Sequence, residues 1–281
     1  MLLKVENLRV AFKLEGRLSV PVRNVSFEIP ENGRVALVGE SGSGKSLTAL
    51  TVGGLVDRAE ISGTIAGSPR IAYIFQNPMQ SMNPVMRVGS QVEEGLRSHV
   101  SDVTSHVSRL LSSVGLPMGT DRKYPCELSG GQQQRVMIAM ALAQEPDLLI
   151  ADEPTTALDV TTQKEVLDLV GRIADERKMA VLLITHNLGL VARYSTFVNV
   201  MYAGEIVERG AVAEVLKRPR HPYTQGLLAA VPRLDAPKDA PLQDIPGTVP
   251  PPWNWPSGCA FHPRCPKARP ECREKSICDF A

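Results

Sequence analysis

A glycine-rich segment between an apolar run and a stretch suited to a helix limits the folds open to this chain more than any other feature. The segment reads RVALVGESGSGKSLTAL over residues 34–50, and Gly39, Gly44, Lys45 and Ser46 match G-x-x-x-x-G-K-[ST]. In this pattern backbone N–H groups surround phosphate oxygens at a helix N-terminus, the lysine adds positive charge, and the hydroxyl serves Mg²⁺. A glycine-rich turn could match by chance, but the flanking strand and helix favour a nucleotide-phosphate site.

A second apolar run ends in two carboxylates. It reads LLIADE over residues 148–153, which places Asp152 and Glu153 at the end of a predicted buried strand. Ligands of parallel sheets bind at that end of the strands. Asp152 is expected to serve Mg²⁺, and Glu153 to polarise the water that attacks a phosphate. A strand end exposed to solvent would show the same pattern, so the two acids indicate a catalytic site only in combination with the phosphate loop.

A third apolar run, AVLLITH at residues 180–186, ends in His186. Alone, such a histidine is more often structural than catalytic. Apolar strands alternate with helical stretches such as VTTQKEVLDLVGRIADE, and this alternation predicts an α/β fold with a mainly parallel sheet. The three strand ends are then expected at one edge of the sheet.

Composition restricts the compartment and the partners. The 281 residues carry 31 basic and 30 acidic side chains, so the net charge of +1 gives no general attraction for nucleic acid. No apolar run reaches the roughly 18 residues of a membrane span, and the start MLLKVENLRV does not resemble a signal peptide. We therefore expect a cytosolic chain, in which clustered cysteines favour metal binding or catalysis over disulfides.

The segment LSGGQ, residues 128–132, precedes a predicted helix and narrows the family. With it the chain closely resembles the ATP-hydrolysing subunits of ABC transporters. The resemblance covers essentially residues 1–215 and runs through the phosphate loop, Gln76 after the strand RIAYIF, the signature, Asp152 and Glu153, the loop Ala157-Leu158-Asp159, and His186.

The resemblance implies ATP and Mg²⁺ as cofactors, and it assigns roles to residues. Two such domains are expected to stack head to tail, so that Ser129 and Gly131 contact ATP held by Lys45 of the other chain. Catalytic roles fall to Glu153, His186 and Gln76, and Mg²⁺ is expected at Ser46, Gln76 and Asp152. Nucleotide contacts are expected from Phe12, Gly39, Ser41, Gly42, Gly44, Lys45, Ser46, Ser129, Gly130, Gly131, Gln132 and Asp159. Phe12 is the predicted adenine-stacking aromatic, although a core role fits its alternation with Val10 and Leu14 equally well.

The resemblance also predicts the organisation of the chain. An ATPase domain is expected over 1–215, with a short antiparallel arm and a helical subdomain at about 77–145 that holds helices near 88–98 and 102–115. The C-terminal extension, 216–281, begins with a short helix in HPYTQGLLAAVPRL and continues through eight prolines between 232 and 258 as a linker or extended strap.

Four of the five cysteines lie in the tail: Cys259, Cys265, Cys272 and Cys278. Their spacing is wider than in most structural zinc sites and differs from short ferredoxin runs, so iron–sulfur, zinc and unligated thiols all remain open on spacing alone. His262 could replace one ligand, and Cys126 is expected to be a small structural residue.

The blocks HPYTQGLLAAVP and GCAFHPRCPKARPEC resemble the C-terminal extension of ATPases that energise dipeptide, oligopeptide and nickel importers. Several members of that branch hold an iron–sulfur cluster on such cysteines, which favours a [4Fe–4S] cluster here. The expected function is ATP hydrolysis for a bacterial peptide importer at the cytoplasmic face of the inner membrane. Expected partners are a second ATPase subunit, two membrane-spanning permease subunits and, through them, an external substrate-binding protein. A nickel or metal-chelate importer is the alternative, and a soluble, non-transport ABC protein or a non-catalytic module is disfavoured.

Overall fold

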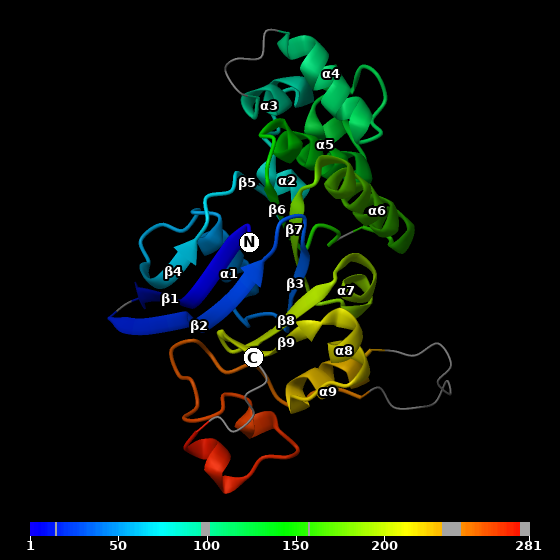
Figure 1. Cartoon of the computed structure of the whole chain (residues 1–281). Helices are drawn as coiled ribbons and strands as arrows, with labels where there is room; N and C mark the ends of the chain where they lie inside the picture. The colour runs from blue at the N-terminus through cyan, green and yellow to red at the C-terminus, as the bar shows by residue number, and fades with distance from the viewer. Residues whose placement is uncertain (15, 97–101, 157, 232–242, 276–281) are drawn as a thin grey trace. The chain divides into compact units, whose positions relative to one another are not determined.

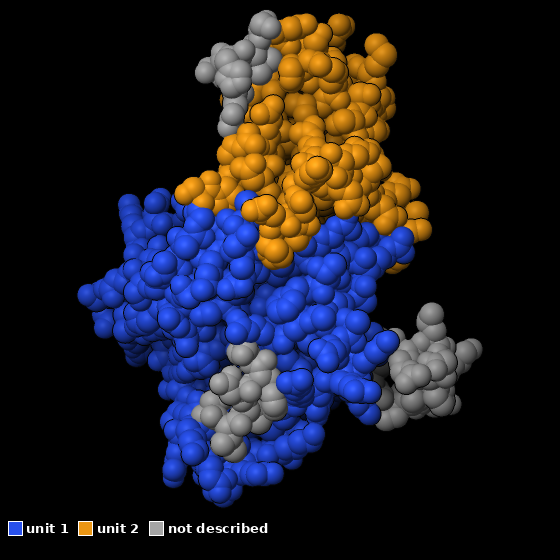
Figure 2. Space-filling model, in the orientation of Figure 1, with its two compact units in different colours: residues 1–29, 34–67, 183–281 blue, residues 30–33, 68–182 orange. Residues whose placement is uncertain are grey.

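The computed structural model describes residues 1–14, 16–96, 102–156, 158–231 and 243–275. It divides into two compact units (Figure 2). The first contains residues 1–29, 34–67 and 183–281, and the second contains 30–33 and 68–182. None of the described helices is long and apolar enough to cross a membrane.

The first unit is built on a mixed sheet with strand order β4-β1-β2-β9-β8-β3 (Figure 1). Its strands are β1 (Leu3–Leu14), β2 (Arg17–Ile29), β3 (Arg34–Val38), β4 (Glu60–Ala66), β8 (Phe197–Tyr202) and β9 (Glu205–Ala211). Strands β1, β2 and β4 pair antiparallel, as expected of the predicted arm, whereas β3 and β8 pair in parallel. The α-helices among the described residues of this unit are α1 (Lys45–Val52), α7 (Leu188–Tyr194), α8 (Val212–Lys217) and α9 (Pro222–Ala229), and two 3-10 helices, His262–Arg264 and Pro270–Arg273, follow in the tail.

The second unit contains residues 77–145, the range of the predicted helical subdomain. Its strands β5 (Ile71–Ile74) and β6 (Leu148–Asp152) pair in parallel, and β7 (Ala180–Thr185) runs from this unit into the first. The α-helices that the structure describes here are α2 (Pro78–Ser81), α3 (Val88–Glu94), α4 (Val103–Ser113), α5 (Gly130–Ala143) and α6 (Val160–Arg177), and two 3-10 helices, Thr120–Arg122 and Pro125–Glu127, lie between α4 and α5. Helices α2, α3, α4 and α6 all contact α5, which is buried along most of its length (Figure 1).

The apolar runs seen in the sequence become the buried strands. Every residue of β6 and β7 is buried, as is typical of strands covered on both faces. The predicted helix at 102–115 is confirmed as α4, whose N-cap Asp102 accepts the backbone N–H of Ser105. The predicted helix at 88–98 is shorter, since α3 ends at Glu94 and residues 97 and 98 lie outside the described part.

The C-terminal extension shares a core with the first unit. Tyr223 of α9 and Phe261 are fully buried in the same apolar cluster as Val38 and Val200 of β3 and β8. The described part of the proline-rich segment crosses β2: the Val20 N–H donates to the Pro252 carbonyl at 2.9 Å, and Trp255 Nε1 donates to the Val20 carbonyl at 2.9 Å. Residues 243–258 are therefore a docked strap and not a free linker.

Candidate functional site

The loop between β3 and α1 takes a shape that requires glycine. Gly42 and Gly44 have φ of 80° and 98°, in the left-handed region that side chains rarely adopt. A Cβ on Gly44 would lie 2.6 Å from the Pro21 carbonyl oxygen, and one on Gly39 would overlap the Met201 carbonyl oxygen. The loop thus packs its backbone against the neighbouring strands. Ser41 lies in the loop and Ser46 in the first turn of α1, and the side chains of both are exposed.

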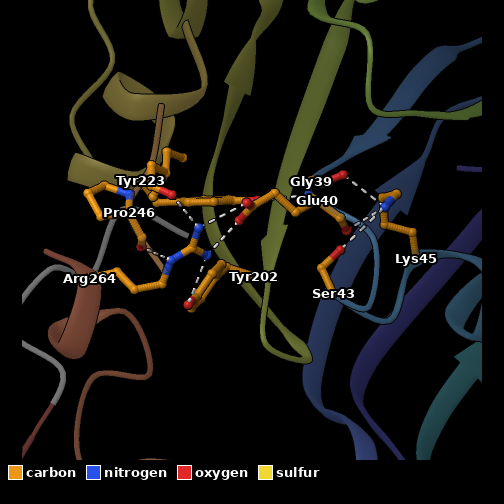
Figure 3. A network of polar contacts seen from close by, with 9 residues as sticks. Gly39, Glu40, Ser43, Lys45, Tyr202, Tyr223, Pro246 and Arg264 are labelled. Carbon is orange, nitrogen blue, oxygen red and sulfur yellow. Dashed lines mark hydrogen bonds and ion pairs between the residues drawn. The ribbon is translucent and has the colours of Figure 1, made fainter. Parts of the chain in front are cut away.

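Lys45 lies across this loop. Its ammonium group donates to the carbonyl oxygens of Gly39 at 2.8 Å and Glu40 at 2.9 Å, and to the Ser43 hydroxyl at 3.4 Å (Figure 3). The residue is only 5% exposed. These contacts place the ammonium group against the loop backbone whose N–H groups would surround a phosphate. This geometry suits the binding of a phosphate group.

The acidic end of β6 lies beside the end of β5 in the second unit. The parallel register ends at Ile74↔Ala151, and two residues further along each segment Gln76 Nε2 donates to Glu153 Oε2 at 3.0 Å. The Thr156 hydroxyl donates to the same carboxylate oxygen at 3.0 Å. The structure therefore brings the predicted residues Gln76 and Glu153 together and adds Thr156, which sequence reasoning missed.

Asp152 has a partner that the sequence analysis also missed. The Tyr73 hydroxyl donates to Asp152 Oδ2 at 2.8 Å. Burial, and then the charge of Asp152, raise the pKa of the Tyr73 phenol above its ordinary value, so the hydroxyl remains a donor at neutral pH. The available signal was a tyrosine, with its polar tip, inside the otherwise apolar strand IAYI.

The signature residues form the start of α5. The Ser129 side chain accepts the Gln132 N–H at 3.4 Å, and the Gln132 side chain accepts the Ser129 N–H at 3.0 Å, which is a capping box. A Cβ on Gly131 would lie 2.7 Å from the Thr162 methyl group, while one on Gly130 would meet only Leu158, at 3.5 Å. Hence α5 starts against the first turn of α6.

Asp159 caps that first turn of α6. Its Oδ1 accepts the N–H groups of Thr161 and Thr162 at 3.0 Å each, and its Oδ2 accepts the Thr162 hydroxyl at 2.7 Å. These bonds, those of Thr162 foremost, hold the pKa of the Asp159 carboxyl below its usual range. Ala157, the first residue of the predicted loop 157–159, lies outside the described residues.

The two remaining predicted side chains lie in the first unit. His186 directly follows β7 and is exposed, next to Asn187, which caps α7 by accepting the Gly189 N–H at 2.9 Å. Phe12 in β1 is half-buried and pairs with Ser19 of β2. Its partial exposure is compatible with either predicted role, so the assignment to adenine stays a prediction.

Three of the four tail cysteines are described, and Cys278 lies outside the described residues. The Cys259 N–H donates to the Cys272 carbonyl at 2.9 Å, and Cys272 Sγ accepts the Arg269 N–H at 3.4 Å. Burial, followed by the nearby Cys259 and Cys272, raises the pKa of the Cys265 thiol. Among the described residues no group of three or more metal-ligating side chains is arranged to hold an ion, so the predicted iron–sulfur site gains no support from this part of the chain. His262, the predicted substitute ligand, directs Nδ1 to the Cys259 carbonyl oxygen at 2.9 Å.

Comparison with known proteins agrees with the geometry. The family profile described as ABC transporter matches residues 22–156, and the one described as oligopeptide/dipeptide transporter, C-terminal region, matches 207–272. A protein of Brucella abortus (strain 2308), provisionally named a peptide import ATP-binding protein, is 43% identical over 96% of this chain and 89% of its own length. A protein of the same provisional name from Brucella ovis is 45% identical over 96% of this chain and 91% of its own.

Solved structures give the same assignment. A dimeric ATP-binding cassette in a post-hydrolysis state with ADP and Pi is 26% identical, with a TM-score of 0.67 over 75% of this chain and 99% of that one. A cassette from Clostridium perfringens, part of the ABC transporter complex cbiONQ, is also 26% identical, with a TM-score of 0.67 over 77% of this chain and 91% of its own. With its phosphate loop, acidic strand end and signature helix, the chain belongs to the ATP-hydrolysing subunits of the ABC transporter family.

Proposed function

We propose that this ATPase energises the import of di- or oligopeptides. The observation that carries the proposal is the match of residues 207–272 to the C-terminal region of oligopeptide/dipeptide transporters, in a segment that shares its core with the ATPase strands. The provisional names of the Brucella relatives agree with it. We further propose that residues 1–215 form the ATPase domain and residues 216–281 the branch-specific extension.

The proposed binding of ATP rests first on the loop at Gly39, Ser41, Gly42, Gly44, Lys45 and Ser46. Its glycines let backbone N–H groups approach the phosphates, and the Lys45 ammonium neutralises their charge. Phe12 stacks on the adenine in this proposal.

A magnesium ion suits the donors that the motifs supply. The Ser46 hydroxyl, the Asp152 carboxylate and the Gln76 amide oxygen are hard oxygen ligands of the kind that Mg²⁺ prefers, and the Ser46 side chain is exposed. When bound, the ion would neutralise charge on the phosphate oxygens. Tyr73 orients Asp152 by donating to its Oδ2.

Glu153 is the proposed group that orients and polarises the attacking water. Its carboxylate is held by Gln76 and Thr156, which fix its direction without neutralising it. His186 is proposed to position the γ-phosphate. The assignment of Lys45, Glu153 and His186 to one nucleotide rests on the order of the family's motifs along the chain.

The active form is proposed to be a dimer of ATPase subunits. In it the signature residues Ser129, Gly130, Gly131 and Gln132, together with Asp159, face the nucleotide held by the phosphate loop of the other subunit. The capping box orients the start of α5, where backbone N–H groups and the helix dipole favour an anion. Two permease subunits and, through them, a substrate-binding protein complete the proposed complex at the cytoplasmic face of the membrane; nucleic acid is not a proposed partner.

A metal at the tail cysteines remains part of the proposal. Cys259, Cys265 and Cys272 lie in one short segment whose ends are joined by the Cys259–Cys272 backbone bond, and thiolates are the ligands of both iron–sulfur clusters and zinc. We favour a structural [4Fe–4S] cluster completed by Cys278. Anaerobically purified protein is expected to contain iron and acid-labile sulfide; zinc without sulfide would move the assignment to zinc, and a metal-free tail would end it.

The test of the transport function uses the assembled complex. The chain is reconstituted with the permease and substrate-binding proteins encoded next to it, and ATP hydrolysis is measured with a di- and tripeptide mixture, with nickel chelates, and with neither. Stimulation by peptides supports the proposal. Stimulation by nickel chelates alone transfers the function to the alternative importer class.

A further inference from the structure

The phosphate loop is bound by the C-terminal extension through one residue, Glu40. Glu40 is the second residue of the loop and lies 224 positions before Arg264. Arg264 Nη1 donates to Glu40 Oε2 at 2.8 Å, and Nη2 donates to Oε1 at 3.0 Å (Figure 3). Two parallel hydrogen bonds between a guanidinium and a carboxylate fix orientation as well as distance.

The other donors of Arg264 are also occupied. Nε donates to the Pro246 carbonyl at 2.8 Å and Nη2 to the Ile245 carbonyl at 3.0 Å, while Nη1 lies 3.5 Å from the Tyr202 hydroxyl. The Arg264 side chain is 5% exposed. Burial disfavours its charge, but the hydrogen bonds to Glu40 and Tyr202 outweigh this effect and raise the pKa of the guanidinium. The Glu40 side chain is 30% exposed, so the pair is a partly buried contact whose paired geometry and buried arginine distinguish it from a mobile surface ion pair.

A second contact holds the backbone of the same loop residue. The Glu40 N–H donates to the Tyr223 hydroxyl at 2.8 Å. The Tyr223 ring is fully buried, with its centroid 4.6 Å from that of Tyr202 and 5.4 Å from that of Phe261. The extension thus binds Glu40 by its side chain from Arg264 and by its main chain from Tyr223 of α9.

Glu40 also connects the extension to Lys45, the lysine of the loop. The Glu40 carbonyl, and that of Gly39 before it, accept the Lys45 ammonium. A rotation of the Glu40 peptide would therefore move both the backbone that surrounds the phosphates and the carbonyls that direct Lys45. In Figure 3 the chain of contacts runs from Arg264 through Glu40 to Lys45.

We propose that Arg264 and Tyr223 are positioning residues for the phosphate loop, so that the ATP affinity of this subunit depends on its C-terminal extension. The inference rests on the proposed role of that loop in binding ATP. Neither side chain belongs to the phosphate-binding motif, and both act through Glu40. The C-terminal extension therefore contributes to ATP binding through Glu40.

The test compares full-length variants by nucleotide binding and by steady-state hydrolysis in the assembled complex. Arg264→Ala removes both bonds to Glu40, Arg264→Lys keeps one charge but not the paired geometry, and Tyr223→Phe removes only the hydroxyl. Arg264→Ala is expected to weaken binding of a fluorescent ATP analogue about tenfold, with smaller losses for the other two variants. Because the loop is displaced and not chemically changed, KM for ATP rises while kcat at saturating ATP stays within about twofold.

A matched control separates positioning from a general loosening of the extension. Arg23 Cζ lies 5.4 Å from the ring centroid of Trp255 in the strap, and Arg23 Nη2 pairs with Glu205 at 2.7 Å; neither partner belongs to the phosphate loop. Arg23→Ala is therefore expected to lower the melting temperature without raising KM. If Arg23→Ala raises KM as much as Arg264→Ala does, the inference is overturned in favour of a purely structural role.

A double-mutant cycle tests whether Arg264 acts through Glu40. If it does, Glu40→Ala and the Arg264→Ala/Glu40→Ala double variant should bind the analogue within about twofold of Arg264→Ala alone. Additive losses overturn the proposed route. Lys45→Ala distinguishes a failure of this inference from a failure of the proposed ATP site. If Lys45→Ala binds the analogue normally, the phosphate-loop assignment itself is rejected. If Lys45→Ala loses binding while the Arg264 and Tyr223 variants bind normally, only the present inference is rejected.

Discussion

One residue of the proposed catalytic site adopts a costly backbone conformation. Glu153 has a φ of 44°, in the left-handed region, which costs a non-glycine residue about 1 kcal/mol or more. The turn places its carboxylate between Gln76 and Thr156 at the end of β6. A side chain held in this way can serve a water molecule with little reorganisation.

Replacing the Glu153 carboxylate by an amide is expected to separate ATP binding from hydrolysis. Glu153→Gln keeps the size of the side chain but removes the group that polarises water, so hydrolysis falls about a hundredfold or more while ATP binding persists. Single-turnover hydrolysis and analogue binding in the assembled complex measure the two effects. Glu176→Gln, at an exposed pair with Arg172, is the control and should leave both unchanged. Near-normal turnover of Glu153→Gln would remove Glu153 from its role.

Gly44 and Gly16 have similar backbone conformations, but replacing each by alanine is expected to lower the stability of the fold by different amounts. Gly44 and Gly16 have φ of 98° and 78°, but a Cβ would meet the Pro21 carbonyl at 2.6 Å in the first and nothing within 4 Å in the second. Gly16→Ala should therefore cost only the backbone strain of about 1 kcal/mol, and Gly44→Ala about 1–3 kcal/mol more. Urea unfolding of both variants checks the order. Equal losses would mean that the loop can move away from β2.

At the scale of elements, the sequence was most informative where apolar runs are continuous. The runs at β3, β6 and β7 predicted buried strands correctly because burial on both faces leaves no polar positions. Because β5 and β6 pair in parallel, their ends lie together, and Gln76 forms a hydrogen bond with Glu153 just beyond them. The contacts of Glu40 with Arg264 and Tyr223 could not be predicted, because no local periodicity links residues so distant in the chain. The same limit left a linker and an extended strap both open for the proline-rich segment, and the packing of Trp255 and Val249 on the core of the first unit decides for the strap.

Helix α9 is expected to weaken in acid because of its N-cap residue, His221. His221 caps α9 by accepting the Tyr223 N–H at 3.1 Å, which needs an unprotonated ring nitrogen. Burial lowers the pKa of His221 from 6.5 to about 4, against the smaller opposing effect of Glu208. The unfolded chain binds the proton more readily, so this contribution to stability is complete above about pH 6.5 and is lost as the pH falls to about 4.

The size of this effect is roughly 3 kcal/mol, since each pKa unit corresponds to about 1.4 kcal/mol. His221→Asn keeps a capping side chain but does not titrate. The difference in unfolding free energy between wild type and His221→Asn should therefore shrink between pH 7 and pH 4. A difference that is independent of pH would show that His221 is not the titrating group.

At the scale of the whole molecule, the residues proposed for one ATP come from both compact units. Lys45 belongs to the first unit and the Ser129 cap of α5 to the second. The family's head-to-tail dimer predicts that Ser129 serves the nucleotide of the other chain. In a dimer the two residues of one ATP then lie on different polypeptides, and this property can be tested by distributing substitutions between two chains.

The test uses dimers assembled from two differently tagged copies, with Lys45→Ala to remove the phosphate-loop cation and Ser129→Asp to place a negative charge before α5. Aspartate still caps the helix, so Ser129→Asp should disturb the nucleotide and not the fold, and Ser129→Thr is the neutral control. When one chain carries Lys45→Ala and the other Ser129→Asp, both changes fall on the same composite site and the second site still binds ATP. When one chain carries both changes beside a wild-type chain, each site loses one residue and neither binds normally. Sites built within single chains require the opposite result, so counting ATP bound per dimer in the two arrangements decides between them.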